Sequence, residues 1–137
     1  MSACSPSASW AQSVDNQSPE NASIFLTQVL KSATVQATDW TYNDGIIHNV
    51  YFTKPCVLKL GATFDARGDF GHGAYDATIN FGTTAAIEQK GTTVYRASSK
   101  TARTQWFTFS TESLASRVAY AMEYLRNSCD QTASTGF

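Results

Sequence analysis

The chain has 137 residues, enough for one domain built around a single hydrophobic core. Charged residues make up only 15% of it, against about 25% in an average domain, so uncharged polar groups must cover much of the surface. The formal net charge is -1 with scattered basic residues, which argues against a nucleic-acid-binding protein, and no apolar run approaches the roughly 20 residues of a membrane span.

Residues 1–17 are polar, poor in aliphatic side chains and without periodicity, so we expect a disordered N-terminal tail. Within it, Ser2-Ala3-Cys4 resembles the end of a bacterial lipobox, in which the cysteine receives a lipid. The resemblance implies a lipid anchor at Cys4, with the rest of the tail tethering the domain to the membrane. The alternative is an incidental cysteine in a flexible tail.

A first helix is predicted to start at Ser18. Ser18 is a favourable N-cap, Pro19 suits the first helical position, and Glu20 interacts well with the positive end of a helix. The apolar residues that follow recur at helical spacing and form one stripe: Ala22, Phe25, Leu26, Val29 and Leu30.

After Ala33 the apolar period changes to two, which predicts a series of β-strands. The first covers residues 34–42 and ends in the turn signal Asn43-Asp44-Gly45. On the second strand, alternation places His48 on one face with Ile46, Val50 and Phe52. We therefore expect His48 to be a core or rim histidine. A two-histidine site with His72 is the alternative if strand pairing brings the two together.

Pro55 separates the second strand from a third, because proline has no N–H for the strand ladder. The apolar residues of the third strand share one face: Cys56, Leu58, Leu60, Ala62 and Phe64. Further strands are expected at residues 77–81, around Ile87, at 94–95 and at 106–109, with a hairpin turn at Lys90-Gly91.

Ser110 or Thr111 is the predicted N-cap of a final helix, with Glu112 in its first turn. Its apolar stripe consists of Leu114, Val118, Ala121, Met122, Leu125 and Cys129. A free helix of this length would be marginal in water, so we expect it to dock on the sheet. Residues 130–137 are expected to form a tail.

These elements predict an α+β fold: an N-terminal helix, an antiparallel sheet of about six or seven strands, and a C-terminal amphipathic helix packed on one face. A single domain would span residues 18–129. Helix-flanked meanders of this kind resemble PH-like folds, in which a terminal helix plugs an open barrel, although fold analogy does not carry function. The last helix, with the pattern Ala115-x-Arg117-Val118-x-x-Ala121-x-x-x-Leu125-x-x-x-Cys129, also resembles that of small secreted bacterial domains of unassigned function. That resemblance implies an envelope location.

Cys56 and Cys129 both fall on predicted buried faces, and we expect them to form a disulfide. A closed loop this long would stabilise the fold by roughly 4 kcal/mol in the chain-entropy model. The bond implies maturation outside the reducing cytosol. Two buried free thiols are the alternative. A zinc site is disfavoured, because the sequence lacks Cys-x-x-Cys and closely spaced Cys/His pairs.

The stretch from Asp65 to Asp76 is predicted to be a long glycine-rich loop rich in chemically active side chains. We expect it to bind a partner through Arg67, Asp69, Phe70, His72 and Tyr75, because arginine and aromatic residues dominate interface hot spots. Trp40, Tyr42 and Tyr51 would add exposed aromatic surface.

Three alternatives remain for this loop. It would be a solvated hairpin without function, or a metal site formed by Asp65, Asp69, His72 and Asp76. The metal spacing fails the EF-hand pattern, since Arg67 takes a ligand position and Phe70 replaces the required glycine. General acid–base catalysis by His72 with a nearby aspartate is the third, but no nucleophile motif accompanies it.

The sequence therefore favours a non-catalytic bacterial envelope protein, periplasmic or secreted, with a lipid anchor at Cys4 as an option. It would bind a macromolecular partner, most simply a protein, as inhibitor and immunity proteins do. No cofactor, metal or nucleic acid is expected. The alternatives are a small-molecule or lipid carrier and a hydrolase that uses His72.

Overall fold

The computed structural model describes residues 18–38, 44–65, 72–99 and 104–134. Along these ranges the elements follow in the order α2 (Pro19–Val29), η1 (Leu30–Ser32), β1 (Thr34–Ala37), β2 (Gly45–Lys54), β3 (Val57–Asp65), β4 (His72–Asn80), η3 (Phe81–Thr83), β5 (Thr84–Lys90), β6 (Thr93–Ser98), β7 (Thr104–Thr108) and α3 (Glu112–Ser134). This arrangement confirms the α+β class expected from the sequence.

Both helices begin as local capping rules predict. The hydroxyl of Ser18 accepts a hydrogen bond from the Asn21 N–H at 3.0 Å, and Pro19 occupies the first turn of α2. Thr111 caps α3 by accepting from the Leu114 N–H at 3.1 Å. The predicted stripes face inward, with Leu26 buried on α2, Leu30 buried in η1, and Val118, Met122 and Leu125 buried on α3.

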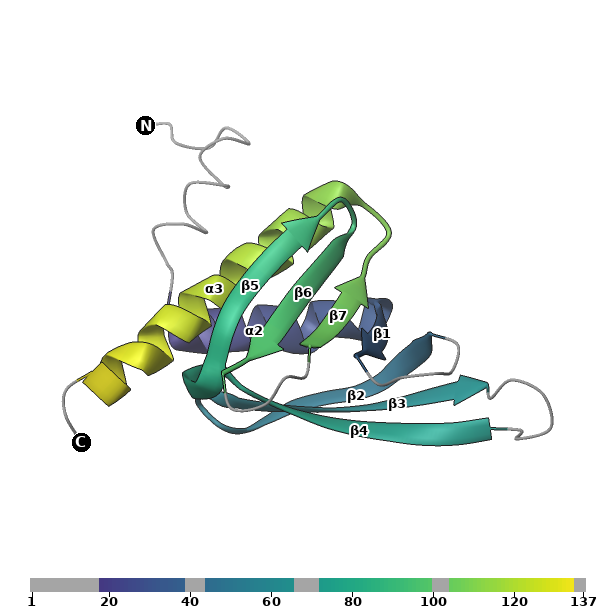
Figure 1. Ribbon diagram of the computed structural model, residues 1–137, viewed down its shortest axis with the longest axis horizontal. Helices are drawn as coiled ribbons and strands as arrows, with labels where there is room; N and C mark the ends of the chain where they lie inside the picture. Colours follow the sequence, from purple (N-terminus) through teal and green to yellow (C-terminus); the bar gives the residue numbers. More distant parts are fainter. Residues whose placement is uncertain (1–17, 39–43, 66–71, 100–103, 135–137) are drawn as a thin grey trace, which may run out of the picture.

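The strands form one antiparallel sheet in the order β4-β3-β2-β1-β7-β6-β5. Strand β1 lies at the centre and joins the two halves, pairing with β2 over two residue pairs and with β7 over four. Such short pairing lets the sheet bend at β1, and Figure 1 shows β2–β4 running at an angle to β5–β7. The two halves are thereby set around a common interior.

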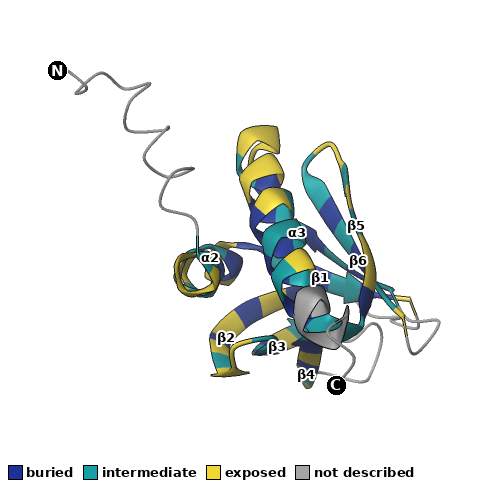
Figure 2. Cartoon of the chain, turned by 90° about the vertical axis from the view of Figure 1, so that its left-hand side faces the viewer, coloured by how far each residue is buried: buried dark blue, intermediate teal, exposed yellow. Residues whose placement is uncertain are grey.

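Both helices lie on the same side of the sheet (Figure 2). Helix α3 packs against β5, β6 and η3, while α2 packs against α3 and β2. The Arg126 guanidinium fixes α3 to the start of β5 by donating to the Ala85 carbonyl at 3.0 Å. The core between the helices and the sheet includes Leu30, Val35, Leu58, Ile79, Phe81, Val94, Phe107 and Leu125.

A disulfide joins Cys56 to Cys129 with an S–S distance of 2.03 Å and a Cα–Cα distance of 6.1 Å. It ties the turn between β2 and β3 to α3 and confirms the pairing predicted from the two apolar faces. The helix does not end at the cysteine, however, and continues to Ser134. The expected tail from residue 130 is therefore shorter than predicted, because no glycine or proline stops the helix before Gly136.

Half of the stretch predicted as a loop from Asp65 to Asp76 is strand. β3 extends to Asp65 and β4 begins at His72, so the connection is residues 66–71 only. Glycine in a strand is tolerated here because a large ring covers it: a Cβ added at Gly73 would overlap the ring of Phe64, its cross-strand partner. The glycine that suggested a loop therefore serves strand pairing.

The prediction that His48 shares a face with Ile46, Val50 and Phe52 holds for Ile46 and is wrong for Val50 and Phe52, and His48 is exposed rather than part of the core. The β2–β3 register shifts between Ile47 and Asn49, which marks a β-bulge. A bulge adds one residue to one strand and so moves the residues before it to the opposite face. Ile46 and His48 are exposed, whereas Ile47 and Val50 are buried.

Candidate binding surface

The outer face of β2, β3 and β4, turned away from both helices, carries an array of exposed side chains. Cross-strand register places these residues in three rows: Ile46–Thr63–Ala74, Asn49–Gly61–Asp76 and Tyr51–Lys59–Thr78. All but Gly61 are exposed. We call this face the outer face.

Two large apolar side chains stand on the outer face. Ile46 is 58% exposed and Tyr51 is 53% exposed. The exposure of Tyr51 confirms the expectation from the sequence. His48 lies beside Ile46, and its Nε2 is 2.6 Å from the hydroxyl of Thr63, so the ring is held against β3 by a hydrogen bond. Exposed apolar residues within a polar rim are typical of protein-binding surfaces.

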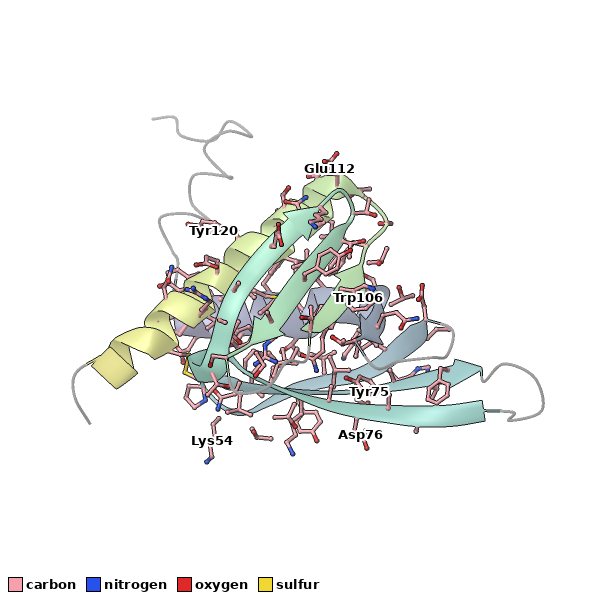
Figure 3. The ribbon with its side chains drawn as sticks, viewed as in Figure 1. Lys54, Tyr75, Asp76, Trp106, Glu112 and Tyr120 are labelled. Atoms are coloured by element: carbon pink, nitrogen blue, oxygen red, sulfur yellow. A yellow bond between two sulfur atoms is a disulfide. The ribbon has the colours of Figure 1, made fainter. Side chains whose placement is uncertain are left out.

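Charged groups border these apolar side chains. Lys54 and Lys59 carry positive charge at one end of the outer face, and Lys54 points away from the body of the molecule in Figure 3. Asp76 lies beside Gly61, close enough that a Cβ added to the glycine would be 3.4 Å from the carboxylate Oδ1. Among the described residues, no lysine or arginine lies within ion-pairing distance of Asp76. Its carboxylate is therefore available to a partner.

The structure places the binding residues predicted from the sequence in different parts of the chain. Arg67, Asp69 and Phe70 belong to the connection 66–71, which is outside the described residues. Trp40, Tyr42 and Cys4 are also outside the described residues. His72 begins β4, where it pairs with Asp65. The connection 66–71 thus joins the end of β3 to the start of β4.

Tyr75 does not belong to this surface. It lies on β4 between exposed Ala74 and Asp76 and is packed against the core. Figure 3 shows Tyr75 and Asp76 on opposite sides of the strand. The Tyr75 hydroxyl accepts a hydrogen bond from the Gln105 amide at 3.3 Å. Successive residues of a strand point to opposite faces, so Tyr75 points inward while Ala74 and Asp76 point outward. The loop prediction did not take this alternation into account.

Tyr75 instead adjoins a buried polar cluster that the sequence analysis did not identify. Arg96 is only 4% exposed, and its guanidinium donates to the Thr84 hydroxyl at 2.8 Å, the Gln105 side-chain carbonyl at 3.2 Å and the Asn80 backbone carbonyl at 3.0 Å. Burial lowers the pKa of Arg96 from its ordinary value, and the nearby Tyr75 acts in the opposite direction. Alternation with buried Val94 would have indicated this inward orientation.

The corresponding face of β5–β7, also turned away from the helices, differs from the outer face. There the rings of Tyr95 and Trp106 pack together with centroids 5.7 Å apart, and the Lys90 ammonium lies 5.5 Å from the Tyr95 centroid. Both rings are half-buried. This half of the sheet covers its own aromatic surface, whereas the β2–β4 half leaves Ile46 and Tyr51 exposed.

No three His, Cys, Asp or Glu side chains gather at metal-binding distance within the parts of the chain that the structure describes. In those same parts, no helix is both long enough and apolar enough to cross a membrane.

Comparison of the sequence with protein-family models and with curated proteins gives no match. Among solved structures, the chain is similar to one described as "PH domain from PfAPH". The TM-score is 0.50 at 15% sequence identity, over 80% of this chain and 92% of the other. At this identity the likeness concerns the fold alone, and it agrees with the PH-like arrangement suggested by the order of elements.

Proposed function

We propose that this chain is a non-catalytic binding protein of the bacterial cell envelope, and that it recognises a protein partner with the outer face and the adjoining connection 66–71. The observation that carries the proposal is the exposure of Ile46 and Tyr51 on a sheet face that neither helix covers. In such an interface the apolar pair would supply the anchors, and Lys54, Lys59 and Asp76 would supply polar contacts at the rim.

The proposed location rests on the Cys56–Cys129 bond, because disulfides form and persist outside the reducing cytosol. The protein would be periplasmic or secreted, or anchored to the membrane through a lipid on Cys4. A small, disulfide-containing domain that offers one face for a protein partner suits an inhibitor or immunity protein.

The test is capture of the partner from an envelope fraction of the source cells, compared between two tyrosine variants. Tyr51 on the outer face and Tyr120 on α3 are matched, at 53% and 55% exposed. Tyr51→Ser should weaken capture at least tenfold, since losing a central aromatic anchor costs about 2 kcal/mol or more. Tyr120→Ser should leave it unchanged. Equal capture by the two variants would remove the outer face from consideration.

The connection 66–71 is tested separately with the double variant Arg67→Ala/Phe70→Ala. We expect capture to weaken further than in Tyr51→Ser alone, while the thermal unfolding midpoint stays the same. Unaltered capture would confine the interface to the strands.

A further inference from the structure

Strand β4 is one of the two edges of the sheet, and its hydrogen-bond pattern shows which backbone groups are unused. The Phe81 N–H donates to the Cys56 carbonyl at 2.8 Å, so these two residues form a hydrogen-bonded pair at the end of the β3–β4 ladder. Hydrogen-bonded and non-hydrogen-bonded pairs alternate in an antiparallel ladder. Tyr75, Ala77 and Ile79 therefore bond to β3. The N–H and C=O groups of Ala74, Asp76 and Thr78 point away from β3, toward the free edge.

The Asn80 carbonyl supports this assignment. By the same alternation it should point away from β3, and it accepts hydrogen bonds from the Arg96 guanidinium at 3.0 Å and the Thr84 hydroxyl at 2.9 Å. The end of β4 is thus satisfied inside the protein. Over the described residues, no hydrogen bond reaches the outward backbone groups of Ala74, Asp76 and Thr78, which are all exposed.

The opposite edge, β5, is better protected than the middle of β4. Its register shifts between Thr84 and Ala86, it carries Glu88 and Lys90, and the Arg126 side chain of α3 occupies the Ala85 carbonyl. Bulges, charges and covering helices are the usual means of preventing strand addition at an edge. β4 pairs with β3 over its whole length without a register shift, and it contains no proline or lysine.

We propose that β4 accepts an extended segment of the protein partner as an eighth strand, with a lysine or arginine of that segment beside Asp76. Backbone bonds to Ala74, Asp76 and Thr78 would hold the segment, as in other cases of strand addition. The exposed Asp76 carboxylate selects a basic residue. A second copy of this chain paired about the middle of β4 would bring two Asp76 carboxylates face to face, which is destabilising.

The inference rests on the proposed function, in that it states how a protein partner docks. Its probe is a short synthetic peptide of alternating valine and threonine with a central lysine. The control peptide has glutamate in place of the lysine. Binding is followed by NMR, through amide shifts and hydrogen exchange along β4. Before addition, the amides of Ala74, Asp76 and Thr78 should exchange faster than those of Tyr75 and Ala77.

The lysine peptide should bind with a Kd of about 1 mM or tighter and protect the three outward amides. The glutamate peptide should bind about fivefold more weakly, since an exposed ion pair and a like-charge pair differ by roughly 1 kcal/mol. Asp76→Asn should remove that preference. No protection of these amides by the lysine peptide would overturn the proposal.

Two variants at one position separate the contribution of the backbone N–H to peptide binding from that of the side chain. Thr78→Pro removes an outward N–H without touching the β3 ladder, and it should weaken peptide binding at least tenfold. Thr78→Ala keeps the N–H and should bind normally. Ala74→Pro provides the same comparison should Thr78→Pro fail to fold. Equal binding by the proline and alanine variants would refute strand addition, as would protection of β4 by self-association without peptide.

The two proposals fail separately. Loss of partner capture in Tyr51→Ser but not in Thr78→Pro would keep the outer face as the interface and eliminate strand addition. Full capture by Tyr51→Ser, with peptide binding at β4 intact, would keep strand addition at β4 and eliminate the outer face as the interface.

Discussion

Arg96 occupies the least ordinary environment among the charged side chains that the structure describes. Its charge is buried, and in that part of the chain no carboxylate lies within ion-pairing distance of it. The desolvation cost is offset by three hydrogen bonds to neutral oxygens, which the planar guanidinium fork can reach at once. Arg96 thereby links β6 to β5, β7 and the end of β4. It holds the two halves of the sheet together at their interior.

Arg96→Met should destabilise the protein by about 1–3 kcal/mol, because the buried side-chain carbonyl of Gln105 loses the hydrogen bond that the guanidinium donates to it. Urea unfolding followed by far-UV circular dichroism measures the change. Lys59→Met, at an exposed position of β3, is the control and should change stability by less than about 0.5 kcal/mol. A stable Arg96→Met protein would mean that apolar packing replaces the cluster without cost.

The Arg96→Lys variant should show a pH dependence of stability that the native protein lacks. The burial that lowers the pKa of Arg96 would also lower that of an ammonium group, whose ordinary pKa is about 10.4. The unfolded chain then binds the proton more tightly than the folded one. Stability therefore increases as pH rises toward about 10.4. Parallel urea unfolding at several alkaline pH values compares the variant with the native protein, and identical profiles would contradict this account.

At the scale of elements, the disulfide connects parts of the chain that are 73 residues apart. Cys56 lies in the turn between β2 and β3, next to η3, and Cys129 lies on the buried face of α3. The cross-link therefore holds α3 against the sheet in addition to the apolar stripe. In the unfolded chain it closes a long loop, which lowers the conformational entropy of that state.

The double variant Cys56→Ala/Cys129→Ala should lose roughly 4 kcal/mol of unfolding free energy. Cys4→Ser is the matched control, and it should unfold at the same urea concentration as the parent. We expect α3 to be the first element to gain hydrogen exchange in the double variant. A loss well below 1 kcal/mol would show that the apolar stripe alone fixes the helix.

At the scale of the whole molecule, the disulfide is the basis of the proposed envelope location. The chain has three cysteines, of which two are bonded to each other, so one thiol remains for alkylation, at Cys4. Intact mass spectrometry of protein isolated from the source cells should show one alkylation adduct without reductant and three with it. A lipid on Cys4 would remove that single adduct and add the mass of its acyl chains. Three adducts without reductant would contradict the proposed envelope location.

Local chemistry in the sequence determined the helix starts at Ser18 and Thr111, the inward stripes and the alternating face of β3, because caps and periodicity act between near neighbours. The apolar face of β3 and the apolar stripe of α3 also identified the Cys56–Cys129 pair. Only the tertiary structure decided the bulge that turns Ile46 outward, the pairing of Gly73 with Phe64, the burial of Arg96 and the unused edge of β4. These features depend on which strands become neighbours and in what register, and residues far apart in the chain settle that together.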